Sequence, residues 1–334
     1  MLSRHHWISR VRLIAVTLGA LAVTALGVVG TAQAAPSADL GSSTRVSSSA
    51  VASAAGSAPS PDALVSASGS VVTPEQGAAS VAARQGRGVQ GSAPSQGKAT
   101  SGMSPSSIIG TDSRFRVTPT TSFPYRATVL ILRNGNLHCT GWMISKDTML
   151  TAGHCVHTGG SGGSWYSGLT FRPGSDGGTA PYGTLTSRGT WALNGWVNSG
   201  STDYDAAIIK LSSPVGTTVG WYGMWWQTAA LDGLFTRVTG YPGDKPSTQW
   251  MSYDSVRASA TDKIYYQNDT VGGMSGSPVW QYRGSTAAYC AGGPCAMAIH
   301  TNGLYGSGLT ASNNSGTRIT QAKFSTFMSI VNQP

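Results

Sequence analysis

A serine enclosed by glycines, in the run Gly-Gly-Met-Ser-Gly-Ser-Pro at residues 272–278, is the stretch best suited to nucleophilic chemistry. Gly273 has no Cβ, so its backbone N–H is free to converge with that of Ser275 on one point. Two such donors form an oxyanion hole, and losing one raises a reaction barrier by about 3 kcal/mol. The lipase motif G-x-S-x-G does not fit, because Ser277 stands where its last glycine would be. The stretch makes Ser275 a candidate nucleophile, with Gly273 and Ser275 as oxyanion donors.

A histidine on a short turn follows two expected strands at residues 139–145 and 148–151. His154 lies in the sequence Thr-Ala-Gly-His-Cys, residues 151–155. An imidazole with an ordinary pKa near 6.5 accepts and returns a proton near neutrality. His154 is therefore the candidate general base.

A carboxylate at the mouth of a buried strand supplies the third group. Asp205 immediately precedes the run Ala-Ala-Ile-Ile-Lys-Leu, residues 206–211. A carboxylate in such a place orients a histidine and stabilises its protonated form. Asp203, two residues earlier, is expected to face solvent.

Four cysteines follow a stretch that resembles a secretion signal, which indicates two disulfides and an oxidising compartment. Three pairings are possible. We favour Cys139 with Cys155 and Cys290 with Cys295, because each pair then closes a local loop. The first bridge would fix the loop of His154 and stabilise the fold by roughly 3 kcal/mol. No Cys-x-x-Cys or His-x-x-x-His spacing occurs, so we expect neither a metal nor a cofactor.

The chain divides into three parts by composition. Residues 1–34 have a basic start, an apolar run and the sequence Ala-Gln-Ala, which is typical of a cleaved signal peptide. Residues 35–106 contain no Phe, Tyr, Trp or Cys, and Ala, Ser and Gly fill 42 of the 72 positions. Such a segment buries too little apolar surface to offset its ordering entropy, so we expect a disordered propeptide.

Residues 107–334 contain all 12 Tyr, all 6 Phe and all 4 Cys of the chain. Short β-type runs alternate with clusters of Gly, Asn, Ser and Pro, which favours an all-β sandwich or a pair of barrels. Only residues 321–333 have apolar side chains at helical spacing, which predicts a C-terminal helix.

The net charge is +9 for the whole chain, but residues 107–334 contain 15 basic and 10 acidic residues, a net of +5. Basic residues are scattered, without a stripe interleaved with aromatics, so nucleic-acid binding is disfavoured. We expect a monomer, without stable membrane association once the signal is removed.

The order His154, Asp205, Ser275 is that of the chymotrypsin arrangement, and the Thr-Ala-Gly-His-Cys context resembles that family. Residues 107–334 also resemble the secreted bacterial glutamyl endopeptidases. The likeness rests on Ser-Ile-Ile-Gly-Thr-Asp at 107–112, Thr-Ser-Phe-Pro-Tyr-Arg-Ala-Thr at 121–128, residues 205–211, Gly-Met-Ser-Gly-Ser-Pro at 273–278 and Ile-His-Thr-Asn-Gly at 299–303.

This resemblance implies a chymotrypsin-like double β-barrel, with barrels at about 107–228 and 229–320 and the triad in the cleft between them. It implies a secreted serine endopeptidase, made as a zymogen, that acts on proteins and peptides and cleaves after glutamate, less readily after aspartate. Thr270 and His300 then bind the substrate carboxylate, with Thr301 beside them, and the amino terminus freed near Ser107 adds positive charge.

Three alternatives stay open. Asp269 occupies the position whose aspartate selects Arg or Lys in trypsin-like enzymes, which would give basic specificity. However, Glu75 is the single glutamate of the chain and lies outside 107–334, as suits an enzyme that cuts after glutamate. The second alternative is a secreted protein of protease fold that only binds, and the third, a lipase or esterase, needs a parallel α/β pattern that this chain lacks.

Met274 replaces the aspartate with which the animal enzymes pair their new terminus, so that activation switch cannot operate here.

Overall fold

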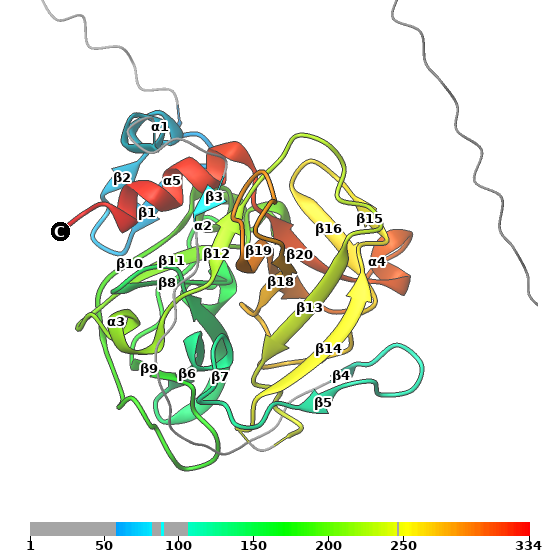
Figure 1. Cartoon of the computed structure of the whole chain (residues 1–334). Coiled ribbons are helices and arrows are strands. Elements are labelled where there is room, and N and C mark those ends of the chain that lie inside the picture. Colours follow the sequence, from blue (N-terminus) through cyan, green and yellow to red (C-terminus); the bar gives the residue numbers. More distant parts are fainter. Residues whose placement is uncertain (1–57, 82–87, 90–105, 246) are drawn as a thin grey trace, which may run out of the picture. The chain divides into compact units, whose positions relative to one another are not determined.

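The computed structural model describes residues 58–81, 88–89, 106–245 and 247–334, and the account below concerns these residues. The expected signal segment, residues 1–34, lies outside the described residues. Figure 1 shows two curled sheets of antiparallel strands with few helices around them. The expected all-β class is therefore confirmed.

The first sheet has eight described strands and a central hairpin. Asn134 and Gly135 form the hairpin turn, with φ of +51° and +82°, which is the left-handed geometry that the Asn-Gly pair predicts. The strands, in spatial order, are β2 (Val71–Val72), β1 (Leu64–Ser66), β10 (Ser187–Leu193), β11 (Ala207–Leu211), β8 (Thr148–Thr151), β7 (Asn136–Met143), β6 (Thr128–Arg133) and β9 (Leu169–Pro173).

The second sheet has ten described strands and a separate core. Its main path is β15 (Ala258–Ser259), β16 (Lys263–Tyr266), β20 (Asn314–Arg318), β19 (Gly293–Asn302), β18 (Pro278–Arg283), β13 (Phe235–Gly240), β14 (Trp250–Ser255) and β5 (Phe115–Arg116). Off this path, β12 (Gly223–Trp225) pairs with β19 and with β3 (Gly88–Val89). A third, two-stranded sheet joins β17 (Thr270–Val271) to β4 (Ser106–Ser107).

The expected division near residue 228 differs from the strand pairing at two places. β5 precedes that point by more than a hundred residues, yet it pairs with β14 of the second sheet. β12 pairs in parallel with β19, so the second sheet begins before residue 228. The chain thus crosses between the two sheets, and sequence order alone does not separate them.

Helices are short apart from α1 and the C-terminal helix. Thr320 caps the C-terminal helix by accepting a hydrogen bond from the Lys323 N–H. Phe324, Phe327 and Met328 are buried in the hydrophobic core of the first sheet, called the first core below. The helix expected at 321–333 is present and ends at Val331. The α-helices are α1 (Pro74–Val81), α2 (Asn194–Ser199), α3 (Gly216–Val219), α4 (Leu309–Ser312) and α5 (Gln321–Val331), and the 3₁₀ turns are η1 (Tyr125–Ala127), η2 (Gly153–Cys155) and η3 (Thr202–Tyr204).

Part of the expected disordered segment 35–106 is folded, so that expectation is wrong for residues 58–81. β1 and β2 extend the first sheet beyond β10, and α1 lies against α5 (Figure 1). The physical reason is that Ala63 and Leu64 are fully buried, and Leu64 belongs to the first core. Few apolar residues are enough when a larger domain supplies the rest of the core. Glu75, near the start of α1, is exposed.

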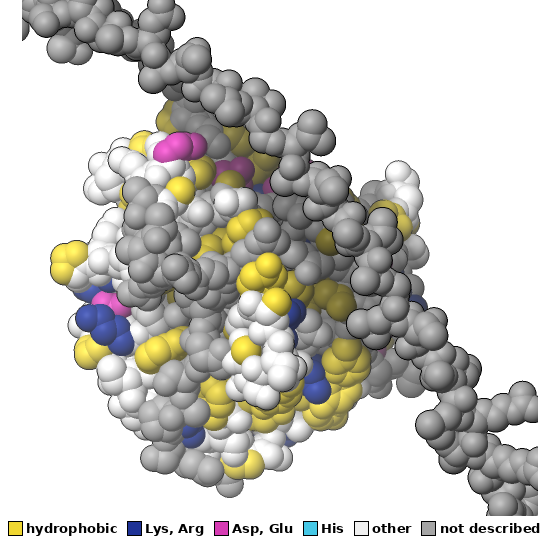
Figure 2. Space-filling view, turned by 45° about the horizontal axis from the view of Figure 1, so that its top comes forward, with side chains coloured by type: hydrophobic (Ala, Val, Ile, Leu, Met, Phe, Trp, Pro, Cys, Tyr) yellow, Lys and Arg dark blue, Asp and Glu magenta, His cyan; other side chains and the backbone are white. Residues whose placement is uncertain are grey.

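The surface has few charges. On the face drawn in Figure 2, the Lys and Arg side chains are scattered rather than gathered in a stripe. Among the described residues, no helix combines the length and the apolar character that a membrane span requires.

Candidate active site

His154 and Asp205 form a hydrogen-bonded pair at the edge of the first sheet. The carboxylate of Asp205 accepts from the His154 backbone N–H at 2.8 Å, and its other oxygen lies 2.7 Å from His154 Nδ1. Asp205 is fully buried, whereas the His154 side chain is about one third exposed (31%), so its other face is open to a substrate. Burial lowers the pKa of His154, but the charge and hydrogen bond of Asp205 outweigh it and raise the pKa above its ordinary value.

The turn before Ser275 contains a glycine in left-handed backbone geometry. Gly273 has φ of +97°, and a Cβ there would lie 2.6 Å from the Tyr241 carbonyl oxygen, so glycine is required. The Gly273 carbonyl accepts from the Thr140 hydroxyl at 2.8 Å, which fixes the peptide. Within the described chain, the N–H groups of Gly273 and Ser275 have no hydrogen-bond acceptor. Both donors remain available to a ligand.

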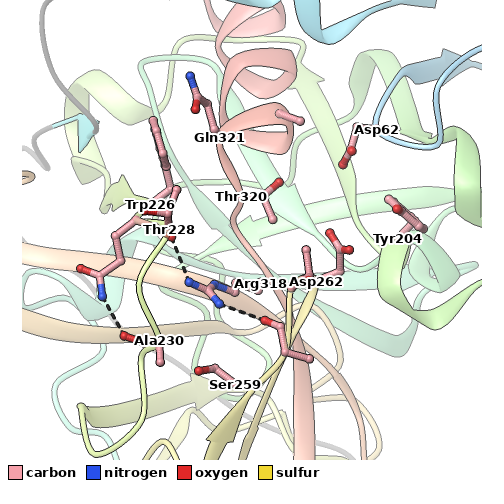
Figure 3. Close-up of a pocket in the computed structure, with 14 residues that line it drawn as sticks. Asp62, Tyr204, Trp226, Thr228, Ala230, Ser259, Asp262, Arg318, Thr320 and Gln321 are labelled. Carbon is pink, nitrogen blue, oxygen red and sulfur yellow. Dashed lines mark hydrogen bonds between the residues drawn. The ribbon is translucent and has the colours of Figure 1, made fainter.

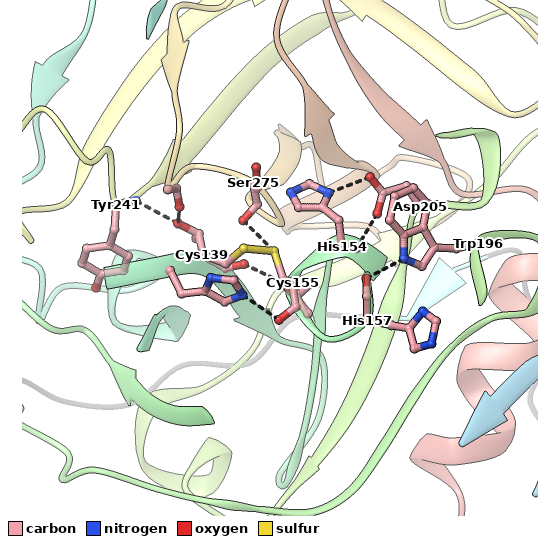
Figure 4. Close-up of a disulfide and its surroundings, with 12 residues drawn as sticks. Cys139, His154, Cys155, His157, Trp196, Asp205, Tyr241 and Ser275 are labelled. Atoms are coloured by element: carbon pink, nitrogen blue, oxygen red, sulfur yellow. Dashed lines mark hydrogen bonds and ion pairs between the residues drawn. A yellow bond between two sulfur atoms is a disulfide. The ribbon is translucent and has the colours of Figure 1, made fainter. Parts of the chain in front are cut away.

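A disulfide joins the histidine loop to β7, next to the Ser275 turn. Cys139 on β7 is bonded to Cys155 on η2, and the Cys155 Sγ lies 3.7 Å from the Ser275 carbonyl oxygen. That carbonyl accepts from the Thr140 N–H at 2.8 Å. In the view of Figure 4, the His154 imidazole is drawn between Ser275 and Asp205, above and to the right of this disulfide.

The second bridge is Cys290–Cys295, so the two disulfides are the local pairs expected. Metal binding has one candidate group in the described part of the chain. Ligand atoms of Cys139, His154 and Cys155 lie within 4.8 Å of one another. Both sulfurs are already committed to the disulfide, which leaves His154 as the one available ligand of this group.

Trp196 on α2 supports the histidine loop, and the sequence reading did not identify it. Its ring makes an edge contact with the His154 ring at 6.1 Å between centroids, and its Nε1–H donates to the His157 carbonyl at 2.9 Å. A Cβ at Gly153 would lie 2.7 Å from the Trp196 ring, so the residue before His154 must be small. The Gly153-His154 pair in the sequence was the available signal for such close packing.

The residues expected to bind an acidic side chain lie on β17 and β19. Thr270, His300 and Thr301 are all buried. The Tyr266 hydroxyl lies 2.8 Å from His300 Nδ1, and burial lowers the pKa of His300 to about 3. The imidazole is therefore neutral at ordinary pH. When Tyr266 donates to Nδ1, the proton of the ring sits on Nε2, which becomes a hydrogen-bond donor.

A buried lysine lies beside these residues and was also missed. Lys263 on β16 is 2% exposed and donates to Thr301 Oγ1 at 3.1 Å and to Asn302 Oδ1 at 2.7 Å. Burial lowers the pKa of this amine to about 8. A lysine within the apolar run Lys-Ile-Tyr-Tyr was a weak signal, because its inward direction depends on the pairing of β16 with β20.

Asp269 is engaged by the segment that follows residue 107. Its carboxylate accepts from the Ile109 N–H at 2.7 Å, from the Ser113 N–H at 2.7 Å and from the Ser113 hydroxyl at 2.6 Å. The residue is 1% exposed. Three donors satisfy this carboxylate, so it is not free to pair with an arginine or lysine of a substrate.

Comparison with known proteins identifies the family of the chain. The family model described as trypsin matches residues 113–322. The glutamyl endopeptidase of Bacillus licheniformis is 46% identical over 219 residues, which cover 65% of this chain and 67% of that protein. A protein of Bacillus subtilis named extracellular metalloprotease is 42% identical over 238 residues, covering 69% of this chain and 72% of its own length.

A solved structure of a Glu endopeptidase in complex with MPD is similar to this chain, with 30% sequence identity and a TM-score of 0.57. The matched region covers 67% of this chain and 98% of the Glu endopeptidase chain. The chymotrypsin-like fold is thereby confirmed. Because the family model spans more than half of the sequence, this chain belongs to the trypsin family and is a serine endopeptidase.

Proposed function

We propose that Ser275, His154 and Asp205 are the catalytic triad of an endopeptidase that cleaves after glutamate. The observation that carries the proposal is the His154–Asp205 pair beside the Ser275 turn (Figure 4). Ser275 Oγ attacks the scissile carbonyl while His154 takes its proton, and Asp205 holds the imidazole in the tautomer with its proton on Nδ1.

The remaining steps follow from the same groups. The N–H groups of Gly273 and Ser275 receive the negative oxygen of the tetrahedral intermediate. His154 then gives its proton to the leaving amine, which leaves an acyl-enzyme on Ser275. Water, deprotonated by His154, hydrolyses this ester and restores the free serine.

The pH dependence of the reaction follows from the raised pKa of His154. The imidazole accepts a proton only when it is neutral, which is the case above its pKa. We therefore expect kcat/KM to fall as the pH drops through a value above 6.5, the ordinary pKa of histidine. Initial rates on a peptide substrate between pH 4 and 9 test this, and a rate that stays constant from pH 5 to 8 would contradict it.

The acidic specificity has support from the names of the relatives and from the chemistry of the expected pocket. The Bacillus licheniformis relative is named a glutamyl endopeptidase. In this chain, Thr270 offers a hydroxyl and His300 offers a neutral Nε2–H, whereas the Thr301 hydroxyl already donates to Asn302 Oδ1 at 3.0 Å. Charge-assisted hydrogen bonds from such donors suit a carboxylate. Lys263, bonded to Thr301, adds positive charge below its pKa of about 8.

Ser107 lies at the same place. It pairs with Thr270 across the β4–β17 ladder, and its carbonyl accepts from the Asn314 side-chain amide at 2.9 Å. In the uncut chain its nitrogen is a neutral peptide nitrogen. Cleavage just before Ser107 turns this nitrogen into an ammonium group beside Thr270, as the resemblance implies. Because the ammonium group forms only on cleavage, we infer that the protein is made as a zymogen.

Replacing His300 with asparagine is expected to reduce the preference for glutamate over glutamine before the cleaved bond. The variant loses the donor that Tyr266 holds in place, and a hydrogen bond to a charged group contributes about 1.5–3 kcal/mol, or roughly 10- to 100-fold in kcat/KM. Paired peptides that differ only in this residue provide the measurement. An unchanged Glu-to-Gln ratio would remove His300 from the pocket.

The specificity as a whole is tested by digesting a denatured, alkylated protein and sequencing the new termini. We expect cuts after glutamate and fewer after aspartate. Cuts after arginine or lysine would transfer the assignment to Asp269 despite its three donors.

We further infer that the enzyme is secreted and acts as a monomer. The signal-like residues 1–34, the disulfides and the name of the Bacillus subtilis relative support secretion. Terminal sequencing of protein recovered from the culture medium tests this inference, and gel filtration tests the monomer.

A further inference from the structure

The segment 59–66 is bonded to the start of α2 by its backbone. The Pro61 and Ala63 carbonyls accept from the N–H groups of Gly195 at 3.0 Å and Asn194 at 2.7 Å. The side-chain amide of Asn194 donates to the Pro59 and Ser60 carbonyls at 2.6 and 3.2 Å. The N–H groups at the start of a helix have no partner within the helix, and here the segment supplies one for each of these two residues.

The same segment continues as part of the first sheet and of its core. β1 pairs with β10 from Leu64 opposite Leu193 to Ser66 opposite Trp191. Ala63 and Leu64 are fully buried. Removing the segment would expose the edge of β10 and leave a cavity at Leu64.

The contact between α1 and α5 is close and depends on a glycine. A Cβ at Gly77 would overlap the backbone carbonyl of Ser325 on α5. Backbone atoms cannot move aside as a flexible side chain can, so a larger residue at 77 must separate the two helices. The fit of these helices is specific to this pair of sequences.

A buried charge is shared between the segment and the domain. Lys323 on α5 is fully buried, and its Nζ forms ion pairs with Asp262 and, at 3.2 Å, with Asp62 of the segment. Asp62 lies on the rim of a cavity of about 760 Å³ that also contains Tyr204 and Arg318 (Figure 3). Loss of Asp62 would leave a buried ammonium with one carboxylate fewer, which is unfavourable.

Different residues of α2 contact the catalytic pair and the segment. Trp196 of α2 contacts His154, whereas Asn194 and Gly195 contact the segment. The hydrogen bonds, strand pairs and ion pairs given above for residues 59–66 do not involve Ser275, Gly273, Thr270 or His300. The segment therefore supports the histidine loop without covering the site.

We propose that residues 59–81 are a structural subunit of the mature enzyme, which stays bound without a covalent link after the chain is cut before Ser107. The inference rests on the proposed maturation cut. Residues 59–81 of the same chain cover the edge of β10 and the face of α5. It closes the core, neutralises Lys323 and holds α2, through which Trp196 supports His154.

The test starts from the full precursor, processed to a new terminus at Ser107 and purified by gel filtration. Native mass spectrometry is expected to find one copy of residues 59–81, whole or cut after Glu75, for each copy of 107–334. Neither this readout nor thermal unfolding requires catalysis, so both stay informative if the proposed activity is wrong. A processed protein that has lost the fragment and keeps the unfolding midpoint of the precursor would overturn the proposal.

Variants of the precursor sharpen the result. Gly77→Val is expected to reduce the retained fragment about tenfold or more and to lower the midpoint, because α1 can no longer approach α5. Val71→Thr, at an exposed position of β2, is the matched control and should retain the fragment. If Gly77→Val does not fold, exchange of a fluorescent synthetic peptide 58–83 into the processed wild-type protein replaces it. The processed protein is warmed toward its unfolding midpoint with a large excess of this peptide. If the peptide does not bind and no native fragment is found, the proposal is also rejected.

Discussion

Replacing Ser275 with alanine is expected to abolish peptide hydrolysis, with a loss in kcat on the order of 10⁶-fold, as for the nucleophile of another serine protease. The variant removes the oxygen that attacks the substrate and leaves the turn intact. The Ser275 carbonyl still accepts from Thr140, and Gly273 keeps its left-handed backbone. We therefore expect an unchanged fold and an unchanged unfolding midpoint, measured by circular dichroism beside the rates on a glutamyl peptide.

A fluorophosphonate probe gives an independent measurement. It should label the wild-type protein at Ser275 and leave Ser275→Ala unlabelled. Ser277→Ala is the matched control, because Ser277 is buried two residues away on the same turn. Hydrolysis by Ser275→Ala at the wild-type rate would end the proposal. A folded wild-type protein that is never labelled would favour a protein that binds without cutting.

Replacing Asp205 with asparagine is expected to lower kcat by about 10⁴-fold, the loss seen when this aspartate is amidated in a related triad. Asparagine preserves the size of the side chain and can still accept from the His154 N–H. Its amide group, however, donates to Nδ1 and leaves the imidazole without a free acceptor at Nε2 for the Ser275 proton. The loss of the negative charge also lowers the pKa of His154, so the acid limb of the pH profile should move to lower pH.

Asp203→Asn is the control for this change. Asp203 lies two residues earlier and is exposed, so its variant should keep nearly the full rate. Equal losses for both variants would show that general charge near the loop, rather than the hydrogen bond to Nδ1, is responsible. A full rate for Asp205→Asn would exclude Asp205 from the triad.

The sequence identified the residues whose surroundings are local. His154 stands beside its disulfide cysteine, Asp205 at the start of an apolar strand, and Ser275 between glycines that the turn requires. The structure places the first two in hydrogen-bond contact, and the comparisons confirm the fold and the family. Short-range signals were sufficient to select His154 and Asp205, which the structure brings into contact, while the catalytic role of Ser275 stays a prediction.

The residues that the sequence did not identify depend on contacts between distant segments. Lys263 looks like an ordinary strand lysine until the pairing of β16 with β20 turns it inward toward Thr301. Trp196 gains its role from the loop of His154. Asp269 occupied the position of a specificity residue, and three donors from residues 109–113 could not be foreseen.

The propeptide shows the limit of composition as a guide. Composition indicates whether a segment can fold by itself, and residues 35–106 have too few large apolar side chains to do so. Residues 58–81 instead complete a core that already exists, so Ala63 and Leu64 are enough. Disorder predicted from composition is therefore reliable only when no larger domain offers an edge and a cavity.

The position of the single glutamate has a consequence for the lifetime of the enzyme. Glu75 is exposed on α1, and residues 107–334 contain no other glutamate. An enzyme that cuts after glutamate meets one such bond in its own chain, between Glu75 and Gln76, and this bond lies in the first turn of α1, the helix that packs on α5. Autolysis at high enzyme concentration would then separate most of α1 from β1 and β2. Residues 107–334 would stay uncut, because they contain no glutamate.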